Sequence, residues 1–150
     1  MNENTMNENT NECVLLCVTG HPSAVTLCNA AQELSKQTNA RLEILCILPP
    51  LDKENPDLQK LETLDRLAQT SGTVVNIYFN ESPVLVAAAF AKKVKATRVA
   101  LGFSERQIPT FANFLRQLLP QVPFAMIGKD GALYQMIPAN RTLITGVRNG

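Results

Sequence analysis

The chain has 150 residues, of which 45% are hydrophobic and 18% charged, as expected for one ordinary folded domain. Its 14 basic and 13 acidic side chains leave a net charge of +1, which gives no general attraction to nucleic acid. The longest uncharged apolar stretch, residues 83–91, is too short to cross a bilayer, and the polar N-terminus predicts no secretory signal. We therefore expect one domain that is neither nucleic-acid-binding nor membrane-inserted.

The chain divides into three parts. Residues 1–12, MNENTMNENTNE, repeat a polar five-residue unit and predict a disordered segment. Residues 13–129 carry all the strong helix and strand patterns and form the predicted domain. Residues 130–150 form a tail that does not continue the pattern.

Short apolar runs alternate with helical patterns along the predicted domain. The first run is apolar on both of its faces, as in a parallel sheet covered on both sides. The predicted strands are residues 14–19, 41–48, 73–79, 97–103 and 123–128. Strands that alternate strictly with helices indicate a doubly wound parallel sheet with right-handed crossovers.

Four helices are predicted between these strands. The first begins at Ser23, a typical N-cap residue, and ends near Asn39. The next two open with Asn55-Pro56 and Ser82-Pro83, and the fourth stops before Pro120. The second helix ends at Gly72. The apolar faces expected for the second and fourth helices are Leu58, Leu61, Leu64, Ala68 and Phe111, Phe114, Leu115, Leu118.

The tail carries a turn signal at Asp130-Gly131 and two apolar stretches, residues 132–137 and 141–147. These stretches predict short strands that form an edge hairpin or an arm pairing with a second chain. We expect a homodimer in which strand five and the tail make the contact, because an apolar edge strand needs cover.

No catalytic or metal-binding set is apparent in the sequence. The four cysteines form no CxxC pair and the one histidine, His21, cannot complete a zinc site with them at usual spacing. We interpret the cysteines as buried thiols of a cytoplasmic protein. The chain has no GxSxG, no P-loop GxxxxGK[ST] and no GxGxxG motif, so we expect it not to be an enzyme.

The order and spacing resemble a universal stress protein domain. The resemblance covers residues 13–129 and is carried by VLLCVTGHPSAVTLCNAAQELSKQTNARLEILCILPP, VLVAAAFAKKVKATRVALGFS and FLRQLLPQVPFAMIG. Within that family the chain looks most like the version found in the potassium sensor kinase KdpD. The resemblance implies an adenine nucleotide alpha hydrolase-like fold, strand order 3-2-1-4-5, and a ligand cleft between the carboxyl ends of strands one and four.

The chain departs from the family's ATP-binding pattern. ATP-binding members carry an aspartate after strand one, where this chain has Thr19, and a glycine-rich phosphate loop after strand four. Gly102 is the only glycine of that loop to remain, and Glu105 stands at the second glycine position. The resemblance therefore implies neither tight ATP binding nor hydrolysis.

Cyclic di-AMP is a second ligand that the resemblance suggests. Domains of the sensor-kinase type that bind it carry a serine-x-serine after strand one and an aromatic-Thr-Ala-x-Tyr segment in strand two. The matching segments here are residues 19–21 and 42–46. One hydroxyl of the first segment is retained, and the aromatic residue and the tyrosine of the second are absent. The candidate ligand-binding residues are Thr19, Gly20, His21, Ser23, Leu48, Gly102, Ser104, Arg106 and Gln107. Among them, Arg106 could clamp an anion or be a solvated loop residue, and His21 could bind a phosphate or be an exposed loop residue.

These observations lead to two functional hypotheses from different classes. The first is a non-catalytic regulatory or signalling domain that senses an adenine nucleotide or cyclic dinucleotide and contacts a protein partner. The second is a dimerisation or docking module with a vestigial cleft. A nucleotide-hydrolysing enzyme is a minor alternative. No certain cofactor is implied.

Overall fold

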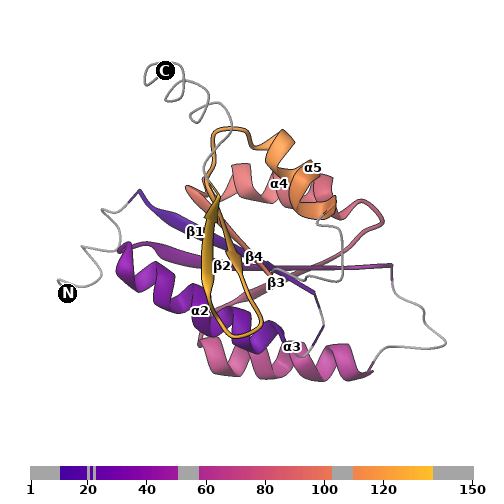
Figure 1. Ribbon diagram of the computed structural model, residues 1–150. Helices are drawn as coiled ribbons and strands as arrows, with labels where there is room; N and C mark the ends of the chain where they lie inside the picture. Colours follow the sequence, from indigo (N-terminus) through magenta and orange to yellow (C-terminus); the bar gives the residue numbers. More distant parts are fainter. Residues whose placement is uncertain (1–10, 20, 22, 51–57, 103–109, 137–150) are drawn as a thin grey trace, which may run out of the picture.

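The computed structural model describes residues 11–19, 21, 23–50, 58–102 and 110–136. In these ranges six strands form one sheet of order β3-β2-β1-β4-β5-β6, with helices on both faces (Figure 1). The strands are β1 Cys13–Val18, β2 Arg41–Leu48, β3 Val75–Phe79, β4 Arg98–Gly102, β5 Phe124–Ile127 and β6 Leu133–Met136. The helices are α2 Ala24–Gln37, α3 Leu58–Ser71, α4 Pro83–Lys93 and α5 Thr110–Leu118. The predicted α/β fold with parallel order 3-2-1-4-5 is confirmed.

The sheet separates two hydrophobic clusters. α2 and α3 lie below the sheet and α4 and α5 above it in the view of Figure 1. β1 lies at the centre between β2 and β4, and all six of its residues are buried. Its alternate side chains therefore enter both clusters, with Leu16 on the α2 side and Leu15 on the α4 side. An apolar run without alternation is the expected sequence of such a strand.

The ends of the helices follow the predicted signals. Asn39 has a φ of 54° just after α2, and Gly72 has a φ of 66° just after α3. Both residue types tolerate this left-handed backbone conformation, which ends a helix by turning the chain away. Pro83 is the first residue of α4, where its missing N–H costs nothing. The start predicted at Asn55-Pro56 lies outside the described residues.

The predicted apolar faces of α3 and α5 are partly wrong. On α3, Leu64 is buried as predicted, but Leu58 and Leu61 are exposed, and Thr63 and Leu67 are buried in addition. On α5, Phe114 and Leu118 are exposed, and the buried residues are Ala112 and Leu115 with Leu119 just beyond. Both helices carry more apolar residues than one packing face can hold, so periodicity alone does not tell which of them meet the sheet.

The tail folds back onto its own chain. β6 pairs antiparallel with β5, from Phe124 opposite Met136 to Ile127 opposite Leu133. The connecting turn is closed by the Gly128 N–H, which donates to the Ala132 carbonyl at 2.8 Å. Of the two covers expected for strand five, the structure shows the chain's own tail, so β5 is not an edge strand. The strand predicted at residues 141–147 lies outside the described part of the chain.

The N-terminal side of the domain meets the sheet at Glu12. Its carbonyl oxygen accepts a hydrogen bond from the Arg41 N–H at 3.2 Å, and its carboxylate accepts one from the Thr97 hydroxyl at 3.0 Å. Residues 1–10 of the predicted disordered segment are not among the described residues. None of the described helices combines the length and hydrophobicity that a membrane-spanning segment needs.

Candidate ligand site at the carboxyl edge of the sheet

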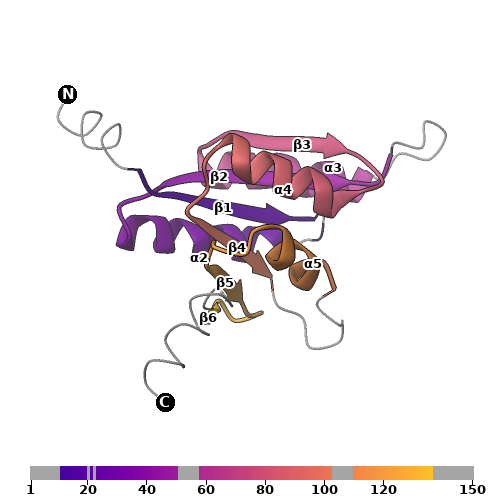
Figure 2. The same cartoon turned by 90° about the horizontal axis from the view of Figure 1, so that it is seen from above.

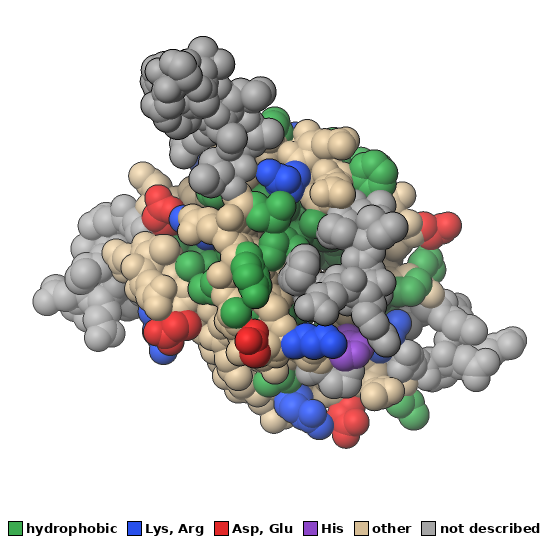
Figure 3. Space-filling model, viewed as in Figure 1, with side chains coloured by type: hydrophobic (Ala, Val, Ile, Leu, Met, Phe, Trp, Pro, Cys, Tyr) green, Lys and Arg blue, Asp and Glu red, His purple; other side chains and the backbone are tan. Residues whose placement is uncertain are grey.

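Three predicted site residues meet where β1 leads into α2. The Nδ1 atom of His21 accepts the Ser23 N–H at 3.0 Å and lies 2.9 Å from the Ser23 hydroxyl oxygen. The His21 N–H in turn donates to the Thr19 hydroxyl oxygen at 3.3 Å. All three residues are exposed, and the histidine, purple in Figure 3, lies on the surface. The loop after β1 therefore presents a linked set of polar groups to solvent.

Ser23 does not cap α2 with its side chain, contrary to the prediction. Its backbone already has helical angles, φ −65° and ψ −10°, whereas a capping side chain needs an extended residue to reach the next turn. His21 supplies acceptors at this end of the helix instead, because its carbonyl accepts the Ala24 N–H at 2.9 Å and its ring accepts that of Ser23. The Ser23 hydroxyl is consequently not committed to the helix.

The ring of His21 has a defined role for each nitrogen. Because Nδ1 accepts a backbone N–H, the neutral ring carries its proton on Nε2. Nε2 is then a donor suited to an oxygen of a ligand. α2 has 14 residues and no acidic residue in its first turn, so the positive end of its helix dipole faces this loop without a counter-charge from that turn. An anion at this loop would meet the Nε2 donor of the ring and this positive end of the helix.

Gly102, the remaining phosphate-loop glycine, is in close contact with α2. It ends β4 next to β1, and a Cβ atom placed on it would lie 2.8 Å from Cδ1 and 3.4 Å from Cδ2 of Leu27. Real Cβ contacts essentially never reach 2.8 Å, so any side chain at this position would force Leu27 to move. The close contact with Leu27 is therefore a packing reason for a glycine at this position.

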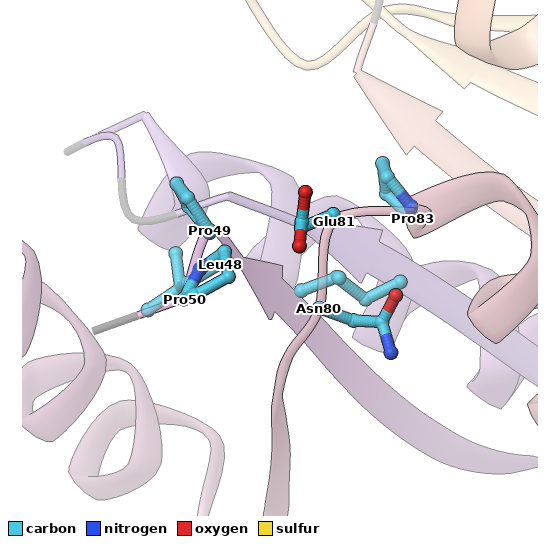
Figure 4. A pocket seen from close by; sticks show the side chains of 7 residues that line it. Leu48, Pro49, Pro50, Asn80, Glu81 and Pro83 are labelled. Carbon is cyan, nitrogen blue, oxygen red and sulfur yellow. The ribbon is translucent and has the colours of Figure 1, made fainter.

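A pocket separate from the His21 loop opens at the carboxyl ends of β2 and β3. Its volume is about 380 Å³, and Figure 4 shows its lining side chains. The lining residues are Ile47, Leu48, Pro49, Pro50, Asn80, Glu81 and Pro83. The Asn80 N–H donates to the Leu48 carbonyl at 2.9 Å, and the Asn80 side chain accepts the Ser82 N–H at 2.7 Å. The described lining is mainly apolar, and Glu81 is the one charged residue among the described residues that form it.

The predicted residues thus fall into three places along one edge of the sheet. Thr19, His21 and Ser23 are joined by hydrogen bonds, Leu48 lies in the pocket, and Gly102 packs against α2. The remaining predicted residues, Gly20, Ser104, Arg106 and Gln107, lie outside the described part of the chain.

Sequence reasoning missed the part of the pocket formed after β3. Asn80 and Glu81 follow a predicted strand directly, in the same way as Thr19 follows the first one. The carboxyl ends of parallel strands share one edge, so this position was the signal that could have identified them.

The four cysteines are free and buried. Burial raises the pKa of the Cys17 thiol to about 12 and that of Cys46 to about 11. Cys17 packs on the α4 side of the sheet and Cys46 on the α2 side, so the two do not face each other. Among the residues that the structure describes, no group of three or more histidine, cysteine or acidic side chains could hold a metal ion.

Comparisons with known proteins identify the fold. No family model matches the chain, and no curated protein matches its sequence. The chain is similar in structure to several solved proteins, including the following three. A universal stress protein from Archaeoglobus fulgidus has a TM-score of 0.60 at 16% identity, covering 77% of this chain and 92% of its own.

The other two structures give the same result. A universal stress protein in complex with cAMP has a TM-score of 0.56 at 18% identity, covering 79% of this chain and 97% of its own. A member of that family from Burkholderia pseudomallei has a TM-score of 0.51 at 17% identity, covering 82% and 97%. These similarities do not link the chain specifically to the sensor-kinase version of the domain. The sheet order, the crossovers and these neighbours together show that the chain has the universal stress protein fold.

Proposed function

We propose that this chain is a non-catalytic regulatory domain that binds a small adenine-containing ligand at the carboxyl edge of its sheet. The observation that carries the proposal is the position of two complementary features on neighbouring strands. The polar loop of His21 and Ser23 follows β1, and the apolar pocket around Leu48 follows β2. A structural neighbour described in complex with cAMP supports a ligand of this class.

Each feature suits a different part of such a ligand. The start of α2 offers N–H donors and a positive dipole to one phosphate group. The pocket offers apolar surface to a base, and the Glu81 carboxylate can accept hydrogen bonds from an exocyclic amine or ribose hydroxyl. The same carboxylate would repel a triphosphate. We therefore propose a monophosphate or cyclic phosphate, such as cAMP or cyclic di-AMP, in preference to ATP.

The proposed domain performs no hydrolysis. The described site offers one imidazole, in the loop after β1, and one carboxylate, in the pocket after β3. General acid–base chemistry requires two groups positioned on the same reacting atoms. We expect ATP to remain intact on incubation with the protein, and release of phosphate at a rate proportional to protein concentration would contradict this part of the proposal.

Ligand binding is tested by thermal unfolding and calorimetry with cAMP, cyclic di-AMP and ATP. A ligand present at a hundred times its dissociation constant stabilises the folded state by about 2.7 kcal/mol. We expect cAMP or cyclic di-AMP to stabilise the protein and ATP to have less effect. His21→Ala and Glu81→Gln should weaken binding, whereas Glu62→Gln on the exposed face of α3 should not. No stabilisation by any of the three nucleotides would refute the proposal.

A second function, dimerisation or docking, is favoured by a separate observation. Large hydrophobic side chains are exposed at both edges of the sheet, on β3 and on β6. On the face seen in Figure 3, hydrophobic side chains gather around β6. We propose that the chain forms a homodimer and that it works in the cytoplasm, where four free thiols stay reduced. A protein partner in a signalling pathway would use the same kind of surface.

A further inference from the structure

β3 forms one edge of the sheet and exposes large hydrophobic side chains on both of its faces. It pairs with β2 alone among the described strands, and Figure 2 shows it at the margin of the sheet. Ile77, Tyr78 and Phe79 are 41%, 39% and 41% exposed. Ile77 and Phe79 share the face of Val75, which packs against the α2 and α3 cluster. Tyr78 lies on the other face, with its ring 5.9 Å from that of Phe90.

This edge lacks the features that normally keep edge strands apart. Natural proteins place charges, prolines or bulges on an edge, because its outward N–H and C=O groups can pair with another strand. Residues 73–80, TVVNIYFN, contain no charged residue and no proline. The strand pairs with β2 in unbroken register from Val75 to Phe79, so no bulge interrupts it. An uncharged, regular and apolar edge is suited to receive another strand.

We propose that β3 pairs antiparallel with β3 of a second copy of this chain, so that two sheets join into one across a twofold axis. This inference names the surface for the second function proposed above and is independent of ligand binding. Pairing centred on Ile77 would set Val75 opposite Phe79 and Asn76 opposite Tyr78. Apolar residues on one face would then meet apolar residues, which is the self-complementary arrangement that a closed dimer needs.

The charges around β3 favour this antiparallel arrangement. With Ile77 at the centre, the first charged residue beyond the strand, Glu81, would lie across from the neutral Thr73 of the second copy. α3 has two basic and two acidic residues, Lys60, Glu62, Asp65 and Arg66, so two copies of it would not repel each other. α4 has Lys92 and Lys93 in its last turn. Antiparallel pairing about a twofold axis puts the lysine pair of one copy and that of the other at opposite ends of the interface. Parallel pairing would bring the two lysine pairs together.

β3 is a better candidate for this contact than β6. β6 has only four residues, and the chain continues from its end directly into residues 137–150, which lie outside the described part. Both ends of β3 are described: Gly72, with a φ of 66°, precedes it, and after it the Asn80 side chain accepts the Ser82 N–H ahead of α4. Pairing β3 of one copy with β6 of the next would be head to tail, and such contacts close only if the rotation allows it.

Light scattering coupled to gel filtration tests the proposal with a matched pair of variants. We expect the full chain at twice its mass of 16.4 kDa, and Ile77→Lys at the single mass. Leu133→Lys on β6 is the control, because Leu133 is 43% exposed and also lies on an edge strand. Circular dichroism checks that each variant is folded.

Three outcomes would overturn the proposal. They are a monomeric full chain at every concentration reached, a dimer disrupted by Leu133→Lys but not by Ile77→Lys, and a ladder of larger species reduced by either change. The last would indicate head-to-tail pairing of β3 with β6.

A cross-link keeps the proposal testable if Ile77→Lys does not fold. In the proposed register residue 77 faces itself, with Cα atoms about 4.5–5.5 Å apart, within the range of a disulfide. Ile77→Cys should form a covalent dimer under mild oxidation, whereas Leu133→Cys should not. The four native cysteines are buried, and the amount of covalent dimer that the unmodified chain forms under the same oxidation gives the background level. Equal cross-linking of both variants, or none with Ile77→Cys, contradicts the assigned interface. A failed nucleotide titration would leave all these results unchanged.

Discussion

Replacing Gly102 with alanine tests whether this glycine is present for packing. The new Cβ atom would lie 2.8 Å from Cδ1 of Leu27 and 3.4 Å from its Cδ2. Leu27 is half-buried and can rotate, so the cost of this overpacking should be near the low end of the usual range, about 1 kcal/mol. No positive φ is involved at Gly102, so the cost comes from the contact alone.

The expected effect changes with the residue at position 27. Alanine in place of glycine restricts the unfolded chain and by itself stabilises by about 0.4–1 kcal/mol. With Leu27 present, the overpacking of about 1 kcal/mol exceeds a gain of about 0.5 kcal/mol, so Gly102→Ala should destabilise the protein by about 0.5 kcal/mol. In a Leu27→Ala background the contact is gone, so Gly102→Ala should stabilise the protein by about 0.5 kcal/mol. The coupling energy between the two positions should therefore be about 1 kcal/mol.

Urea unfolding of the four proteins in this double-mutant cycle measures the coupling. Gly72→Ala is the control, because Gly72 has a φ of 66° and no neighbouring atom within 4 Å of a Cβ. It should cost about 1 kcal/mol with either residue at position 27, since the penalty is conformational. If Gly102→Ala has the same effect with Leu27 as with alanine, the packing explanation is refuted, and a role in binding becomes the better reason for the glycine.

Three further predictions concern the tail, the thiols and the start of α2. Deleting everything after Lys129 removes β6 and bares the apolar edge of β5, so urea unfolding should show a loss of about 2 kcal/mol, and equal stability would contradict the account of the tail. The folded pKa of Cys17, about 12, lies above its ordinary value of 9.0, so the unfolded chain loses this proton first and stability should fall as pH rises from about 9 toward 12. The slope for this thiol is at most about 1.4 kcal/mol per pH unit, and it should disappear in Cys17→Ala. Ser23→Ala should lower the free energy of unfolding by less than about 0.5 kcal/mol, which is less than the loss of an N-cap costs. His21→Ala should lower it by about 1 kcal/mol in thermal unfolding. A larger loss for Ser23→Ala than for His21→Ala would show that Ser23 caps the helix after all.

Much of the fold could be read from local patterns. β1 is apolar at every position because it lies between two strands and under helices on both faces, and such burial leaves no alternation in the sequence. The helix ends at Asn39 and Gly72 and the start at Pro83 depend on the backbone conformation of single residues. Signals of this kind need no distant contact, so the sequence predicted them.

The candidate site was predicted only in part. Its position at the carboxyl ends of the strands follows from topology, and Thr19, His21 and Leu48 do lie there. The roles of the residues did not follow, because the Ser23 hydroxyl could be assigned to the helix or to His21 only once the backbone angles were known. The contribution of Glu81 to the pocket depends on β3 lying beside β2, which a single stretch of sequence does not state.

The sequence by itself determined the kinds of elements, their order and the parallel sheet, because these depend on periodicity, caps and connection lengths within short segments. Only the tertiary structure decided which apolar residues are buried and which edge is left open. Leu64 and Leu67 of α3 are buried while Leu58 and Leu61 are exposed. The outer edge of β5 is covered by β6, whereas the edge of β3 that faces away from β2 is covered by no described strand. Burial and edge exposure are properties of what lies opposite a residue, and that neighbour comes from a distant part of the chain.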